Sequence, residues 1–171
     1  MAASLRYSPP DDDICGYLVG VWKRSLEWRE FGPGFQHLRT SNSLVVVEDC
    51  PDAAVEPGTR ILDWRFGKDL DDTKVGFSMQ FFRGQDETLV EWTYKGRVCR
   101  GDFSPGAAAL SLSFRDCDGM VSNATYRAVD ANTMTVCLAE VDSRHTPVMQ
   151  YGLMCRLSPD TAAASAAAAV S

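Results

Sequence analysis

The sequence predicts an all-β protein, an antiparallel up-and-down β-barrel of about 8–10 strands with a short N-terminal helix. Roughly ten short runs rich in β-branched and aromatic residues follow one another along the chain. Clusters of Gly, Pro, Asp and Asn separate them at intervals of about 10–15 residues. After residue 20 no segment has a convincing apolar stripe of helical period.

Short connections between so many strands indicate a meander, and a long meander leaves two exposed edges. Closure into a barrel pairs both edges and removes them. A two-sheet sandwich is the alternative, but it usually needs longer crossing connections than the turns found here.

The elements are expected in the following order. Residues 1–13 form a flexible leader, in which Pro9 and Pro10 block a helix and an Asp can cap the next segment. One or two helical turns end at Gly20, and the barrel domain covers 14–158. The Ala-rich residues 159–171 are expected to form a disordered tail. Strands are predicted near 20–29, 42–49, 59–66, 74–83, 87–95, 97–103, 108–115, 121–129, 133–141 and 148–157.

Composition narrows the function classes. The net charge is −6 and no dense cluster of Lys and Arg occurs, so nucleic acid is not an expected partner. No run of 18 apolar residues predicts a membrane span, and no secretory signal precedes the barrel. Six widely spaced cysteines and two histidines do not predict a metal site, and free thiols are expected. The expected location is the cytoplasm, or a plastid if a transit peptide was removed.

Strand alternation predicts which side chains point into the barrel. In most strands one face is large and apolar and the other is mixed or polar. An interior lined by aromatic rings and a few polar groups is a typical small-molecule site. The predicted ligand-binding residues are Trp64, Phe77, Met79, Trp92, Tyr94, Phe114, Arg127, Glu140 and Tyr151. Aromatic residues at this spacing can also simply fill a core, and that reading stays open.

The stretch around Gly20-Val21-Trp22 carries a resemblance. A helical turn, then Gly-x-Trp entering the first strand, then a meander resembles the calycin group of lipocalins and fatty-acid-binding proteins. The resemblance implies that Gly20 lets the chain bend into the first strand and that Trp22 covers the barrel floor. It also implies a basic side chain packed on that indole, for which Arg156 and Arg127 are the candidates.

A narrower resemblance involves residues 124–142, ATYRAVDANTMTVCLAEVD. This segment is similar to the late hairpin of the S-type phycobiliprotein lyases, which hold a linear tetrapyrrole and deliver it to a cysteine of an acceptor protein. The matching features are Tyr126-Arg127 before a turn and Glu140 at the end of the next strand. The resemblance implies that Arg127 and Glu140 orient the carboxylates of a ligand.

Three functions follow from these observations. The first is a carrier that holds a small hydrophobic ligand, namely a bilin or other tetrapyrrole, an isoprenoid or a fatty acid. The second is a chromophore lyase or isomerase on the same barrel, with an acceptor protein as partner. The third is an interaction module with a filled core. The sequence shows no recognisable set of catalytic residues. It predicts no definite cofactor, and a tetrapyrrole is the candidate bound ligand.

Overall fold

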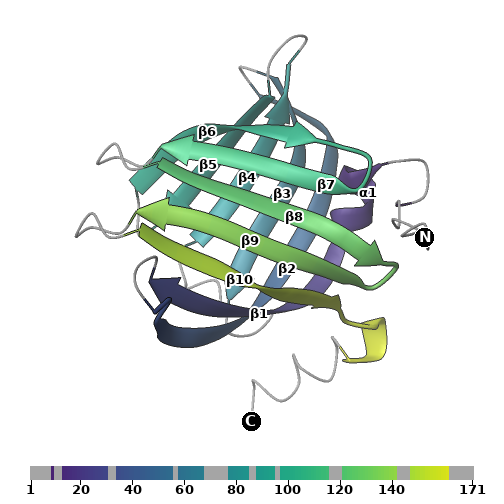
Figure 1. The fold of residues 1–171 in the computed structure, drawn as a ribbon. Helices are drawn as coiled ribbons and strands as arrows, with labels where there is room; N and C mark the ends of the chain where they lie inside the picture. Colours follow the sequence, from purple (N-terminus) through teal and green to yellow (C-terminus); the bar gives the residue numbers. More distant parts are fainter. Residues whose placement is uncertain are drawn as a thin grey trace, which may run out of the picture.

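A computed structural model describes residues 9, 13–30, 34–55, 58–67, 77–84, 88–94, 97–115, 121–141 and 147–161. Backbone alone is described at 51–55, 58, 59, 66, 67, 77, 94 and 97. One helix precedes ten strands (Figure 1). They are α1 (Ile14–Leu18), β1 (Gly20–Glu30), β2 (His37–Val55), β3 (Gly58–Gly67), β4 (Phe77–Arg83), β5 (Thr88–Tyr94), β6 (Arg97–Pro105), β7 (Ala109–Arg115), β8 (Val121–Asp130), β9 (Thr133–Val141) and β10 (Pro147–Arg156).

The ten strands form a single closed barrel in the order β1-β10-β9-β8-β7-β6-β5-β4-β3-β2, with β1 also paired to β2. All neighbouring pairs are antiparallel. The predicted fold class is therefore confirmed: an up-and-down barrel with a short helix near the N-terminus. Closure pairs the backbone N–H and C=O groups of both edge strands of the meander, which is the reason this topology was expected.

The second strand is longer than the sequence predicted. A break was expected after residue 49, at the turn-rich segment DCPDAAVEPG, but β2 continues to Val55. The pairing with β3 shifts register between Asp49 and Ala53, which is an irregularity of the kind a bulge produces. The turn-forming residues between Asp49 and Ala53 thus remain within β2, and the hydrogen-bond ladder to β3 is interrupted there.

Two strands place the face opposite to the expected one toward the interior. On β10 the buried residues are Val148, Gln150 and Met154, so Tyr151 points outward. On β8 Tyr126 and Ala128 are buried and Arg127 is exposed. The prediction that Tyr151 and Arg127 face the interior was wrong. Both faces of β10 carry apolar side chains, and only the pairing with β1 and β9 selects one of them.

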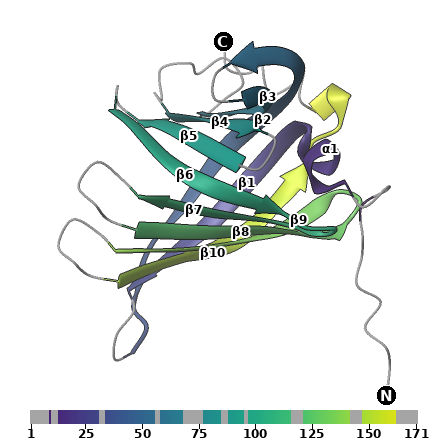
Figure 2. The ribbon, with the colours of Figure 1, turned by 90° about the horizontal axis from the view of Figure 1, so that it is seen from above.

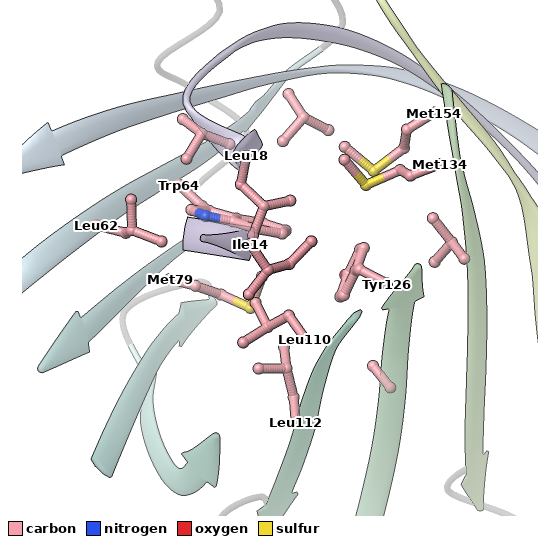
Figure 3. Close-up of a cluster of buried hydrophobic side chains, with 14 of the residues drawn as sticks. Ile14, Leu18, Leu62, Trp64, Met79, Leu110, Leu112, Tyr126, Met134 and Met154 are labelled. Carbon is pink, nitrogen blue, oxygen red and sulfur yellow. The ribbon is translucent and has the colours of Figure 1, made fainter. Parts of the chain in front are cut away.

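Helix α1 closes one end of the barrel, at the right-hand side of both ribbon views (Figures 1 and 2). Asp13 caps it, since its side chain accepts a hydrogen bond of 3.0 Å from the backbone N–H of Cys15. Ile14 and Leu18 are buried at 2% and 0% exposure. They pack in a cluster with side chains from opposite walls of the barrel, including Trp64 and Met154 (Figure 3). This end of the interior is therefore filled.

The Gly-x-Trp segment completes the closed end. Trp22 is fully buried, and its indole Nε1 donates to the Leu18 carbonyl at 2.7 Å. The Arg156 guanidinium lies 4.2 Å from the Trp22 ring and donates to the carbonyl oxygens of Val19, at 2.6 Å, and of Tyr17. The expected cation–π contact is confirmed, with Arg156 rather than Arg127 as the cation.

Gly20 has the backbone conformation that the bend requires. Its φ is 136°, in the range that side-chain-bearing residues rarely adopt. A Cβ at this position would lie 2.7 Å from Nη1 of Arg156. Glycine is needed here both for the turn into β1 and for the close approach of the guanidinium that covers Trp22.

After β10 a helical turn covers residues 159–161, and the rest of the predicted Ala-rich tail lies outside the described residues, as does most of the leader. In the described part of the chain, no helix has the length and apolar character needed to cross a membrane.

Candidate functional site

The inner wall of the barrel changes character away from α1. Along β9 the inward side chains go from Met134 and Val136, at 0% and 2% exposure, to Leu138 and Glu140, which are partly exposed. Because these residues face the interior of a closed barrel, solvent reaches them from the end opposite α1. This end is called the open half below.

Two aromatic side chains line the inner wall between the two halves. The rings of Trp92 and Phe114 lie 5.6 Å apart at 54°, and Trp92 is only partly buried. Trp64 and Met79 also face inward but are 0% and 2% exposed, so they belong to the packed interior. Phe77 and Tyr94 lie on β4 and β5, but their side chains are outside the described residues.

Arg24, which is not among the predicted ligand-binding residues, points into the barrel. Arg24 lies on the β1 face that also carries the buried Trp22 and Leu26, and it is itself partly buried. Its Nε donates to Ser43 Oγ at 2.9 Å. It also donates to the hydroxyl of Tyr126, which extends from β8 toward β1. The signal was present in the sequence, because Arg24 alternates in register with Trp22.

Burial shapes the electrostatics of this contact. Loss of water lowers the pKa of Arg24, and the hydrogen bond and charge interaction with Tyr126 oppose that shift. Burial raises the pKa of Tyr126, against the effect of the neighbouring guanidinium. At neutral pH the Arg24 side chain is therefore a guanidinium cation and the Tyr126 side chain beside it is a neutral phenol. An arginine remains protonated far above pH 7.

A carboxyl group lies on the inner wall of the open half. Glu140 alternates with Met134, Val136 and Leu138 on the inner face of β9. Gln150, 5% exposed on β10, donates through Nε2 to Glu140 Oε1 at 2.8 Å. The amide holds the carboxyl group in a fixed orientation. Glu140 therefore faces the barrel interior, and its role toward a ligand stays a prediction, whereas its expected partner Arg127 lies on the outer face.

The rim of the open half is formed partly by the β1–β2 hairpin. Trp28 Nε1 donates to Ser41 Oγ at 3.1 Å. The guanidinium of Arg39 stacks 3.9 Å from the centre of the Trp28 ring. Trp28 is partly exposed and shares the inward face of Trp22 and Leu26. Its indole, which is not among the predicted ligand-binding residues, adds an aromatic surface at this end of the barrel.

Tyr151 takes part in a separate cluster on the outer surface. Its hydroxyl donates to Glu27 Oε2 at 2.8 Å and accepts from Arg29 Nε at 2.8 Å. Arg29 Nη2 also binds Glu27 Oε2 at 3.1 Å. The hydrogen bonds from Tyr151 and Arg29 lower the pKa of Glu27. This network connects β1 to β10 on the outer face of the barrel.

Among the described residues, no group of three or more His, Cys, Asp or Glu side chains lies in a metal-binding arrangement. Cys15, Cys50, Cys137 and Cys155 carry free thiols, and burial raises the pKa of Cys15.

Comparisons with known proteins find a match in fold among the solved structures. No family model matches the sequence, and no curated protein matches it. Among solved structures, the S-type phycobiliprotein lyase CPES from Guillardia theta superposes with a TM-score of 0.57. The match covers 90% of this chain and 94% of the lyase at 12% identity. At that identity the match shows the fold alone, and the barrel architecture that the resemblance implied is confirmed.

Proposed function

We propose that this calycin-type barrel binds an elongated apolar ligand that carries both a carboxylate and N–H donors, and we favour a linear tetrapyrrole. The observation behind the proposal is a pair of opposite charges on the inner wall. Arg24 supplies a cation and Glu140 an anion, and Trp28, Trp92 and Phe114 are aromatic side chains on the same inner wall.

The two charges favour different parts of such a ligand. A guanidinium donates paired hydrogen bonds to a carboxylate, and these are strong where water is scarce. A carboxylate such as Glu140 accepts hydrogen bonds from pyrrole-type N–H groups. Flat conjugated rings pack against indole and phenyl rings. A fatty acid would use Arg24 alone and an isoprenoid neither group, so a tetrapyrrole matches more of the wall than either alternative.

The structural neighbour gives independent support for this choice. A phycobiliprotein lyase has the same barrel over nearly the whole chain. A bilin-sized ligand in the present barrel would occupy the open half, because side chains of α1 fill the other end (Figure 3).

The test is a titration monitored by tryptophan fluorescence, with biliverdin, palmitate and retinol as probes. We expect biliverdin to quench the emission most strongly, because Trp28 and Trp92 lie near its site. Arg24→Met should weaken biliverdin binding at least about tenfold, equivalent to about 1.4 kcal/mol. Arg127→Met is the matched control, since that arginine is exposed on the outer face, and it should bind as the wild type does.

Two results would contradict the proposal. Absence of quenching by all three probes would favour an interaction module with a filled core. Equal biliverdin affinity of the Arg24→Met variant and the wild type would remove the guanidinium from the site.

A second candidate function is a chromophore lyase or isomerase, favoured by the orientation of Glu140. A carboxyl group that is fixed by Gln150 and faces the ligand space can transfer a proton to or from a bound ligand. Glu140→Gln should then abolish turnover or transfer of bound biliverdin while the absorption spectrum still reports binding. A wild-type protein that binds but never converts or transfers the pigment is a carrier.

A further inference from the structure

The β1–β2 hairpin carries two arginines on its inner face, at different depths in the barrel. Residues directly opposite each other in an antiparallel pair have their side chains on the same face. Arg24 of β1 pairs with Ser43, and Arg39 of β2 pairs with Trp28. Because Trp28 and Arg24 share the inner face of β1, Arg39 also faces inward. The ligand site described above includes Arg24 and gives Arg39 no role beyond its stacking on Trp28.

Arg39 lies at the entrance of the open half and makes a contact that a ligand can replace. Its guanidinium is 3.9 Å from the centre of the Trp28 ring, and the residue is exposed. Within the described part of the chain, no carboxylate forms an ion pair with Arg39. An exposed cation–π contact is weak, whereas a guanidinium can donate two charge-assisted hydrogen bonds to a carboxylate. The Arg39 cation is therefore available to an acidic group of a ligand.

The strand pairings align the groups at this entrance across four neighbouring strands. Trp28 of β1 pairs with Arg39 of β2 on one side and with Gln150 of β10 on the other. Gln150 in turn holds the Glu140 carboxyl group of β9 by its hydrogen bond of 2.8 Å. A cation and a carboxyl group thus flank an indole, with three strand spacings of about 4.8 Å, or roughly 14 Å, between their strands. The bond from Trp28 Nε1 to Ser41 Oγ holds this indole in place without Arg39.

We propose that Arg39 binds a ligand carboxylate at the entrance, so that the barrel takes a ligand with two carboxylates. This inference rests on the function proposed above and adds a second anchor to Arg24. Arg39 and Ser43, the residue opposite Arg24, are four positions apart on β2. At about 3.3 Å per residue, the two anchors are offset by roughly 13 Å along the hairpin. Both side chains are long and flexible, so carboxylates closer together than this are also within their reach.

A linear tetrapyrrole of the biliverdin type has the chemistry that these groups require. It carries two propionate carboxylates, pyrrole-type N–H groups and a flat conjugated ring system. One propionate binds Arg24 in the interior, and the other draws Arg39 away from Trp28 at the entrance. The indole face released in this way packs against a pyrrole ring. A fatty acid has a single carboxylate and would leave Arg39 stacked on Trp28.

Tryptophan fluorescence titrations of the full chain with biliverdin and with its dimethyl ester test this inference. The ester keeps the rings and the N–H groups but has no carboxylate. Arg39→Met should weaken biliverdin binding about fivefold, the size expected for an exposed ion pair, and should leave ester binding unchanged. Arg115→Met is the matched control, because Arg115 is exposed at the same end of the barrel but on the outer face of β7. It should bind both probes as the wild type does.

The double variant Arg24→Met/Arg39→Met should bind biliverdin and the ester with equal affinity, because both carboxylate contacts are gone. Equal biliverdin affinity of Arg39→Met and the wild type overturns the inference. An equal loss for both probes also overturns it, since the stacking on Trp28 would then be the whole role of Arg39, and so does the same loss in Arg115→Met.

The outcomes separate this inference from the proposed function. If Arg24→Met weakens biliverdin binding and Arg39→Met does not, the proposed function stands and only the second anchor is excluded. A wild type that binds neither probe overturns both.

Discussion

The two halves of the barrel interior are built from the same strands but filled differently. Beside α1, Ile14, Leu18 and Trp22 meet side chains from the opposite wall, and all three are at most 2% exposed. In the open half the inward positions hold Trp28 and Glu140, which remain partly exposed. The interior of this closed barrel is therefore densely packed at one end and partly exposed to solvent at the other. The side chains of α1 fill the end of the barrel next to the helix. At the other end no helix fills the interior of the described barrel, and polar side chains can face inward there.

Removing the plug at the closed end should have the largest effect on stability. Trp22→Ala deletes a fully buried indole, its hydrogen bond to Leu18 and the surface under Arg156. We expect a loss of about 3–5 kcal/mol in the free energy of unfolding, measured by urea denaturation. Trp92→Ala, in the partly exposed wall, should cost only about 1–2 kcal/mol because less surface is removed from packing. Equal losses would show that the two halves are packed alike.

The bend before β1 should show a smaller effect. Gly20→Ala forces a Cβ onto a residue with φ of 136° and against the Arg156 guanidinium. We expect a loss of about 1–3 kcal/mol by urea denaturation. Gly34→Ala is the matched control, since Gly34 also has a positive φ, of 94°, but has no atom within 4 Å of the added Cβ. If both variants lose the same amount, the contact with Arg156 contributes nothing beyond backbone strain.

The smallest effect is expected on the outer surface, where Glu27, Arg29 and Tyr151 connect β1 to β10. The folded-state pKa of Glu27 lies below the ordinary 4.5 because of hydrogen bonds from Tyr151 and Arg29. Its contribution to stability is therefore present above that value and is lost as the pH falls through the folded-state pKa. Glu27→Gln should flatten the acid side of the stability profile at pH values below the ordinary 4.5 of this carboxyl group, measured by thermal unfolding. A variant that is as acid-sensitive as the wild type would exclude this network as the cause.

Part of the candidate site was visible in the sequence. Trp92, Phe114 and Glu140 were assigned to the interior from strand alternation, and they face it. The same rule places Arg24 inside, since it alternates with Trp22 and Leu26, although the predicted site contained Arg127 of a later strand. Its contact with Tyr126 could not be predicted, because β1 and β8 are separated by two strands and meet only across the interior.

By itself the sequence determined the number and order of the strands, the closure of the meander and the Gly-x-Trp bend, because turn chemistry and β-rich runs are local properties. The tertiary structure alone decided which faces of β8 and β10 point inward and how far α1 fills the barrel. A strand with apolar side chains on both faces, such as β10, has no inward direction of its own. Its neighbours impose one through the register of the hydrogen-bond ladder, so Gln150 is buried and Tyr151 remains outside.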